Sequence, residues 1–223
     1  MSSEQPVAAR LGHVLWIGGP PDSGKTSIAG ALAAAYGLRV YHFDRQEPAH
    51  IRRADPARQP ALTRLRVMLE TLDERAFAEA LWLAQEPEEM ARWTIASWSE
   101  RCGMALDDLS ELPPAPTIVA EGPGFFPECV APLLDDPRQA VWLVPDEEFK
   151  RASVARRGKP GARVHTSDPE RATRNLTARD LLLGQHVREQ AQARGLTVLP
   201  VETRHDLAAV TALVAAHFAP WLP

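Results

Sequence analysis

The feature that most constrains this chain is an eight-residue loop, Gly19 to Thr26, with the sequence GPPDSGKT. It matches the pattern GxxxxGK[ST] and lies between two segments of different periodicity. Residues 13–18 (HVLWIG) form a short apolar run that favours a buried strand, and residues 25–36 carry apolar side chains at helical spacing before Gly37. A glycine loop between a strand and a helix turns backbone N–H groups inward and aims a helix N-terminus at the same point, which binds phosphate. The loop therefore predicts an α/β fold with an anion site after its first strand.

The same loop predicts the groups that it would hold. The Lys25 ammonium is expected to reach the β- and γ-phosphates of a nucleoside triphosphate, and the Thr26 hydroxyl is expected to ligate Mg²⁺. The chain holds 22 arginines and only 3 lysines, and one of the three stands where this chemistry requires a lysine. We therefore expect ATP and Mg²⁺ as cofactors. The loop residues expected to contact the nucleotide are Gly19, Asp22, Ser23, Gly24, Lys25, Thr26 and Ser27.

Strand and helix patterns alternate along the rest of the chain. Apolar runs that favour four further buried strands lie at residues 38–43, 117–120, 140–144 and 196–201. Helical patterns lie at residues 61–109, 146–157 and 168–194, and in a last segment that carries Leu207, Val210, Val214 and Phe218. Breaks in the long central pattern are expected at Pro87 and Gly103.

This order predicts a three-layer α/β/α fold of the P-loop NTPase type with a five-stranded parallel sheet. A helical insert is expected between the second and third strands, over about residues 47–112, and an arginine-rich lid after the fourth, over about residues 146–167. Residues 1–223 are expected to form a single domain, because a chain of this length supports one core.

Charge and hydropathy exclude several classes of protein. The formal net charge of −4 argues against a protein that coats nucleic acid. No apolar run approaches the length of a membrane span, and the first ten residues lack the apolar core of a secretion signal. Cys102 and Cys129 have neither metal-ligand nor CxxC spacing. We expect a cytoplasmic protein with free thiols and with neither nucleic-acid nor membrane partners.

With these motifs in place, the chain resembles the P-loop kinases of the nucleoside-monophosphate-kinase-like group, which includes shikimate, gluconate and chloramphenicol kinases and the zeta-toxin kinases. The resemblance rests on the GPPDSGKT loop, Asp44 after the second strand, the segment EGPGFFP at 121–127, an arginine-rich stretch and the final strand. It implies a phosphotransferase that moves the γ-phosphoryl group of ATP to a hydroxyl of a small-molecule acceptor. It also implies that Thr203 and Arg204, after the last strand, contact the adenine.

An alternative is a P-loop NTPase that acts as a nucleotide-dependent switch or as a binding module. The chain contains no [NT]KxD motif for reading guanine and no LSGGQ-type signature. The switch would hydrolyse nucleotide without an acceptor. The binding module would require that neither Asp44 nor Glu121 is catalytic.

Two acidic residues compete for the role of general base. Asp44 follows the second strand, whose carboxyl end opens on the crevice beside the phosphate loop, where a carboxylate can take the proton of an acceptor hydroxyl. Glu121 ends the third strand and can act as the base or hold Mg²⁺ together with Thr26. Each also has a structural interpretation, Asp44 as a helix cap and Glu121 as an exposed turn residue. We favour Asp44 slightly and expect His42 on the opposite face by strand alternation.

Basic residues gather around the predicted lid. Closing arginines can stabilise the charge that spreads over a transferring phosphoryl group, and Arg156 and Arg157 are the catalytic candidates there. Further basic residues of this region are Lys150, Arg151, Lys159, Arg163, Arg174 and Arg179. The alternative is a solvated basic helix face.

The predicted insert is acidic and rich in tryptophan. Residues 70–111 carry a net charge of −8, whereas residues 150–174 carry +6. An acidic insert beside an acceptor pocket suits a neutral or cationic acceptor, although a solvated helical surface explains the same charges. Aromatic walls often line small-molecule pockets, but aromatics at helical spacing more often pack in a core. Core packing is therefore the favoured interpretation of Trp82, Trp93 and Trp98.

Overall fold

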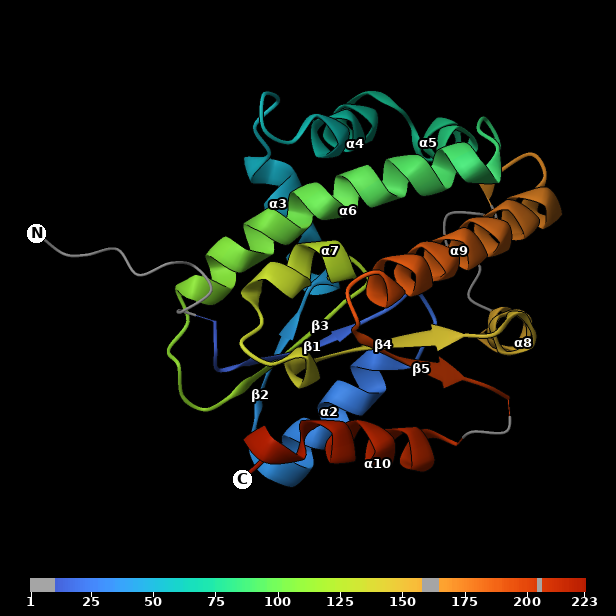
Figure 1. Cartoon of the computed structure of the whole chain (residues 1–223). Coiled ribbons are helices and arrows are strands. Elements are labelled where there is room, and N and C mark those ends of the chain that lie inside the picture. Colours follow the sequence, from blue (N-terminus) through green and yellow to red (C-terminus); the bar gives the residue numbers. More distant parts are fainter. Residues whose placement is uncertain (1–10, 158–164, 204–205) are drawn as a thin grey trace, which may run out of the picture.

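A parallel β-sheet forms the centre of the computed structural model, which describes residues 11–157, 165–203 and 206–223, with Arg157 described in its backbone alone. The five strands run parallel in the order β2-β3-β1-β4-β5 (Figure 1). They are β1 (Val14–Gly18), β2 (Arg39–His42), β3 (Ile118–Glu121), β4 (Ala140–Pro145) and β5 (Thr197–Val201). The five predicted strands are confirmed, each within one residue at both ends. Short runs of apolar residues identified them because β1, β3 and β4 are buried along their whole length.

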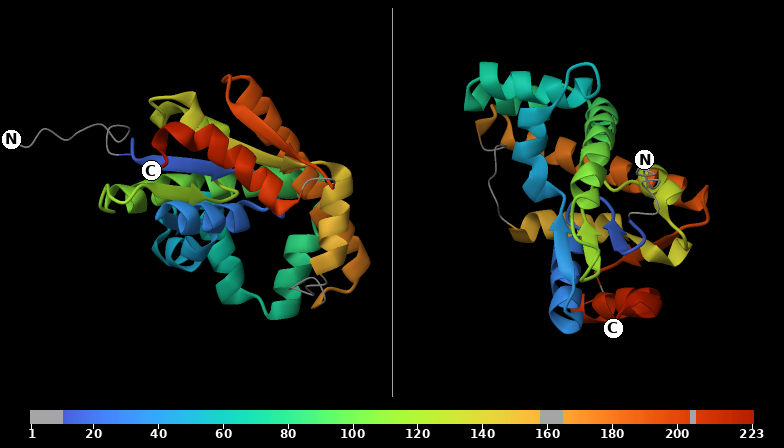
Figure 2. Two further views of the ribbon diagram at one scale, coloured as in Figure 1. Left: turned by 90° about the horizontal axis from the view of Figure 1, so that it is seen from below. Right: turned by 90° about the vertical axis from the view of Figure 1, so that its left-hand side faces the viewer.

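Helices cover both faces of this sheet (Figure 2). The α-helices are α2 (Lys25–Tyr36), α3 (Glu47–Arg53), α4 (Pro60–Thr71), α5 (Glu74–Trp82), α6 (Pro87–Ser110), α7 (Pro127–Val130), α8 (Glu147–Arg157), α9 (Pro169–Gln192) and α10 (Leu207–Phe218). Short 3₁₀ turns are η1 (Asp44–Gln46), η2 (Ala131–Leu133), η3 (Pro137–Gln139) and η5 (Ala219–Trp221). The predicted three-layer α/β/α class is confirmed.

Alternation along β1 separates two cores. Leu15 and Ile17 pack with apolar residues of α2 and α10 on one face, whereas Val14 and Trp16 pack on the other with residues of α6 and the segment after β3. Figure 1 shows α2 and α10 on one side of the sheet and α6, α7 and α9 on the other. The phosphate loop leaves β1 between these layers, because β1 is the central strand.

The predicted helical insert between β2 and β3 consists of α3 to α6, the longest of which is α6. Pro87 begins α6, in agreement with the expected break there. The break expected at Gly103 is wrong, because α6 continues through it to Ser110. Its neighbours Cys102 and Met104 are buried, and their packing outweighs the cost of one glycine in a helix, about 1 kcal/mol.

Two further expectations concern the thiols and the membrane. Cys102 is buried, Cys129 is partly buried, and both are free thiols. In the part of the chain that the structure describes, no helix has both the length and the apolar character needed to cross a membrane.

Candidate functional site

The phosphate loop has the backbone shape that an anion site requires. Gly19, Asp22 and Gly24 have φ angles of 127°, 68° and 85°. A Cβ at Gly19 would collide with the carbonyl oxygen of Leu143 in β4, so glycine is required there for packing as well as for φ. At the start of α2 no side chain caps the first turn and no acidic residue lies in it. The N–H groups of that turn are therefore left for a ligand, and the helix N-terminus favours an anion.

Lys25 is folded back onto this loop. Its side chain is buried, and Nζ donates to the carbonyl oxygen of Pro20 at 2.8 Å and to Ser23 Oγ at 3.1 Å. Burial lowers the pKa of Lys25 from 10.5 to about 8, although the carboxylates of Glu121 and Asp44 act in the opposite direction. An ammonium that is destabilised by burial gains most when an anion arrives, which suits a phosphate-binding lysine.

Thr26 and Glu121, the two predicted magnesium ligands, are in contact. The Thr26 hydroxyl donates to Glu121 Oε2 at 3.1 Å, and His42 Nδ1 lies 2.7 Å from Glu121 Oε1. Glu121 is buried, and neighbouring groups hold both of its carboxylate oxygens. Thr26 and Glu121 present oxygen ligands of the kind that Mg²⁺ prefers, so a magnesium ion fits this site.

The expectation that His42 points to the opposite face is wrong. In the parallel register His42 of β2 pairs with Glu121 of β3, and paired residues of adjacent strands point to the same face of a sheet. Residues two apart along a strand share a face, so alternation itself places His42 on the side of Asp44, and the expectation applied that rule wrongly. The pairing of β2 with β3 then brings His42 to Glu121.

Asp44 faces the phosphate loop across a cavity. It is the first residue of η1, just past β2, and lines a space of about 200 Å³ together with Lys25, Thr26, Trp98 and other loop residues. Among the described residues no group donates a hydrogen bond to its carboxylate. Asp44 is exposed to this cavity, and partial loss of hydration among its neighbours raises its pKa, while the charges of Lys25 and Arg101 oppose that rise. The structure thus brings both candidate bases to one site, with Glu121 held by partners and Asp44 open to the cavity.

A second, more apolar cavity adjoins the loop on the side of α10. Its volume is about 230 Å³, and its lining includes Ser23 and Gly24 of the loop. The other lining residues are Ile28, Phe149, Arg156, Val201, Asp206, Leu207 and Val210. Arg156 of the predicted lid therefore lies at this cavity, together with Ser23 and Gly24 of the phosphate loop.

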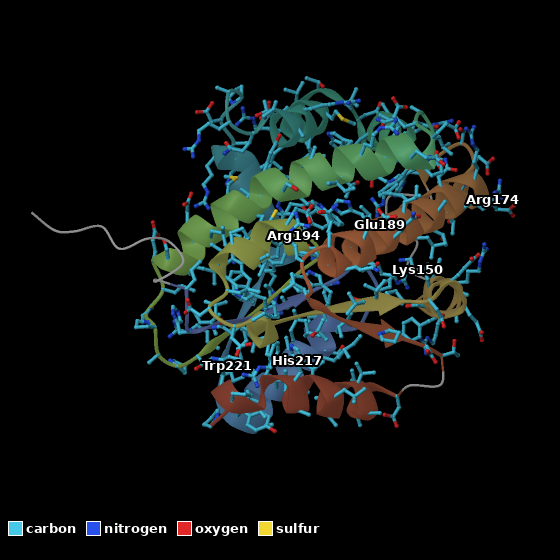
Figure 3. The ribbon with its side chains drawn as sticks, in the orientation of Figure 1. Lys150, Arg174, Glu189, Arg194, His217 and Trp221 are labelled. Atoms are coloured by element: carbon cyan, nitrogen blue, oxygen red, sulfur yellow. The ribbon has the colours of Figure 1, made fainter. Side chains whose placement is uncertain are left out.

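The other lid and adenine candidates are placed differently. The side chain of Arg157, together with Lys159, Arg163 and Arg204, lies outside the described residues. Thr203 is exposed, beyond the residues that line the apolar cavity. Arg174 is exposed toward the outer end of α9, where it pairs with Glu170 at 3.8 Å (Figure 3).

Lys150 is not an open phosphate contact. It is buried under α9, and its Nζ donates to Asp22 Oδ2 at 2.6 Å and to Asp180 Oδ2 at 2.5 Å (Figure 3). Arg179 binds the other oxygen of Asp180, with Nη2 at 2.6 Å. Lys150 and Arg179 are thus parts of a buried ionic network that joins α8 and α9 to the phosphate loop. The spacing of the basic residues gave no signal for it, because Asp22 and Asp180 lie 128 and 30 residues away from Lys150.

Among the tryptophans of the insert, the favoured interpretation of core packing is confirmed for Trp98 and wrong for Trp82 and Trp93. Trp98 packs against the main core, with its ring stacked 6.3 Å from that of Phe126, but it also lines the phosphate-loop cavity. Trp82 and Trp93 are partly exposed, lie outside the main cores and line a further cavity in the insert.

Comparison with known proteins gives a structural likeness and no match in sequence. No protein-family model matches the chain, and no curated protein sequence matches it. A solved structure of shikimate kinase from Acinetobacter baumannii in complex with shikimate matches over 96% of this chain and 97% of that chain. The two are 15% identical, and the TM-score is 0.48. The order of the strands and the phosphate loop define the fold of this chain, and its function depends on the residues of the site.

Proposed function

We propose that this protein is a phosphotransferase that moves the γ-phosphoryl group of ATP, with Mg²⁺, to a hydroxyl of a small-molecule acceptor. One observation carries the proposal. The Asp44 carboxylate, without a hydrogen-bond donor among the described residues, lines the same cavity as Lys25 and Thr26. A switch NTPase has to position a water molecule, whereas a kinase needs an open carboxylate at the place where an acceptor hydroxyl enters.

The two cavities beside the loop suit the two parts of a nucleotide. The phosphate loop, with Lys25 and the uncapped start of α2, suits the triphosphate. The cavity walled by Ile28, Phe149 and Val210 is apolar and of a size for a nucleobase. A contact of Thr203 and Arg204 with the edge of the adenine stays a prediction; both residues come shortly after the end of β5 in the sequence.

Glu121 and Asp44 then have separate roles. Thr26 and His42 hold both oxygens of Glu121, which suits a residue that orients a magnesium-bound group. Asp44 has no such partner and a raised pKa, which suits a group that takes a proton. In the proposed step the acceptor hydroxyl gives its proton to Asp44 as its oxygen bonds to the γ-phosphorus, and the bond to the bridging oxygen of ADP breaks.

Bound ATP with Mg²⁺ supplies the transferable group. Lys25 binds and orients its phosphates. Arg156 lines the apolar cavity proposed for the nucleobase, and Arg157 follows it in α8. This part of the chain would supply the cations that close over the phosphates. Closure of such a segment excludes water, so that transfer to the acceptor is favoured over hydrolysis.

The test measures ADP release with and without a panel of hydroxyl compounds and looks for the mass gain of one phosphoryl group. We expect ADP release to be slow with ATP alone and to be stimulated by an acceptor. Asp44→Asn should lower the turnover number about 100-fold or more while ATP still binds. Glu121→Gln should instead raise the Mg²⁺ concentration that is required, and Glu148→Gln, at an exposed position of α8, is the control.

Two results would contradict the proposal. One is rapid hydrolysis of ATP that no acceptor changes. The other is full transfer by Asp44→Asn together with its loss in Glu121→Gln, which would exchange the two roles.

A further inference from the structure

A third cavity lies inside the insert, bounded by α5, α6 and α9, and we call it the insert cavity. Its volume is about 240 Å³. Six of the residues that line it are Glu47, Phe77, Trp82, Trp93, Trp98 and Arg179. Four of these six side chains are aromatic, and they come from α5 and α6.

The insert cavity adjoins the site of the proposed reaction. Trp98 lines both the insert cavity and the phosphate-loop cavity. Glu47 begins α3 directly after η1, the turn that starts at Asp44. A molecule held among the aromatic residues therefore lies next to the cavity of Asp44 and Lys25, with Trp98 between the two.

We propose that the insert cavity binds the acceptor of the phosphoryl group, and that this acceptor is a neutral aryl alcohol that also carries a hydrogen-bond-accepting group. This inference rests on the proposed function for the transfer step. The position of the cavity, its lining and its charge balance carry the choice of substrate class.

The aromatic side chains are held rigidly, as the walls of a binding site for a flat ring should be. The guanidinium of Arg179 lies 5.2 Å from the centre of the Trp82 ring, and that of Arg64 lies 5.7 Å from the centre of the Trp93 ring. Trp98 is stacked on Phe126. Because each ring is fixed from one side, little side-chain entropy is lost when a ligand packs against the other.

Two hydrogen-bond donors of the cavity walls have no partner. The indole Nε1 atoms of Trp82 and Trp93 are buried, and no acceptor binds them in the described part of the chain. A buried donor without a partner costs about 1–3 kcal/mol, so such groups are usually satisfied in a working state of a protein. A ligand with an ether, carbonyl or nitro oxygen would satisfy them once a small rotation of the indole rings turned the N–H groups into the cavity.

The charged groups of the cavity are balanced by the protein itself. Glu47 Oε2 accepts from Arg101 Nη1 at 2.6 Å. Arg179 donates to Asp180 Oδ1 through Nε at 3.0 Å and Nη2 at 2.6 Å. Since each charge already has a partner, a charged ligand would bring an uncompensated charge into the cavity, whereas a neutral ligand would not. The cavity therefore favours a neutral acceptor over a carboxylate or phosphate ester.

The test compares three sets of compounds of similar size: neutral aryl alcohols such as 4-methoxybenzyl alcohol, aryl carboxylates such as 4-methoxybenzoate, and polyols such as myo-inositol. Binding is measured by saturation-transfer NMR in the absence of nucleotide, and transfer by mass gain with ATP and Mg²⁺. We expect neutral aryl alcohols to bind and to be phosphorylated in preference to both other sets. Preference for the carboxylates or polyols, or no binding of any aryl alcohol, would overturn the inference.

Variants of the walls test where the compounds bind. Thr94→Trp fills the insert cavity and should abolish binding of the aryl alcohols, whereas Ala96→Trp, on the exposed side of the same helix, should leave it intact. Trp93→Phe keeps an aromatic face and removes the N–H group. It should raise KM about 2- to 10-fold, the equivalent of one hydrogen bond, with little change in kcat.

The control for Trp93→Phe is Trp221→Phe, in η5 after α10. Full binding by Thr94→Trp would place the compounds elsewhere and refute the inference. Failure of the proposed function is distinguishable: aryl alcohols would then bind and be blocked by Thr94→Trp, but no phosphoryl transfer to any compound would be detected.

Discussion

Substitution of Lys150 by methionine tests whether the phosphate loop depends on the buried ionic network behind it. The Lys150 side chain is 1% exposed and bridges Asp22 of the loop and Asp180 of α9, whose side chains are 14% and 1% exposed. Methionine keeps much of the volume and removes the charge. Asp22 and Asp180 would then lose their shared cation in surroundings that give little solvation in return.

The magnitude follows from which partners remain. Removing one member of a buried ion pair costs about 3–5 kcal/mol, because the other charge is left uncompensated. Asp180 keeps Arg179 at 2.6 Å, and Asp22 retains some contact with solvent. We therefore expect the free energy of unfolding to fall by about 3 kcal/mol, at the lower end of that range. For a chain of this length each kcal/mol corresponds to about 2–4 °C, so Tm should fall by about 6–12 °C.

Urea and thermal unfolding measure this loss, and the next residue of α8 provides the control. Arg151 pairs with Glu147 at 2.6 Å, but the side chains are 67% and 59% exposed. Arg151→Met should therefore cost no more than about 0.5 kcal/mol. Combining Lys150→Met with Asp180→Asn should cost less than the sum of the single changes, since both then remove the same interaction. Equal effects of Lys150→Met and Arg151→Met, or a loss below about 1 kcal/mol, would refute the reasoning.

Three further outcomes are expected. Gly124→Ala should destabilise the protein by about 2 kcal/mol in thermal unfolding, because a new Cβ would strike the phenylalanine ring that follows β2, whereas Gly103→Ala meets nothing within 4 Å and should add about 0.5–1 kcal/mol. The pKa of Lys25 is lowered to about 8 in the folded protein. Between about pH 8 and 10.5 the unfolded chain therefore binds a proton at Lys25 that the folded protein does not bind. The free energy of unfolding without nucleotide should rise with pH in this range. ATP binding should take up a proton above pH 8 and weaken as pH rises, as calorimetry in two buffers would detect; the absence of proton uptake would contradict this. His42→Ala frees one oxygen of Glu121, and should raise the Mg²⁺ concentration at half-maximal activity several-fold without changing Tm by more than a few degrees.

The sheet was predictable because its three inner strands, β1, β3 and β4, are buried on both faces. Central parallel strands such as β1 and β4 read as uninterrupted apolar runs, and the glycine loop marked where β1 ends. The phosphate-loop residues were predictable for a related reason. Their chemistry depends on a local backbone shape that eight consecutive residues determine on their own.

The rest of the site depends on which distant segments become neighbours. His42 meets Glu121 because β2 lies beside β3, and Lys150 meets Asp22 because α8 lies over the loop. Neither adjacency has a signature in sequence spacing. Gly103 shows the converse, since a local helix-breaking signal was overruled by burial of residues on either side.

The charges of the insert could not be interpreted from the sequence either. The acidic stretch and the basic stretch looked like separate surfaces for ligands, but part of their charge joins them to each other. Three contacts link α5 and the start of α6 to the segment that leads into α9: Glu74 Oε1 with His165 Nε2 at 3.1 Å, Glu79 Oε1 with the Ser167 N–H at 2.5 Å, and Glu86 Oε1 with Arg171 Nη2 at 3.8 Å. Exposed pairs of this kind are worth at most about 1 kcal/mol each, and their number does not set the potential inside a cavity. The charge of the acceptor therefore has to be inferred from the insert cavity, where Glu47 and Arg179 each already have a partner, and that balance favours a neutral molecule.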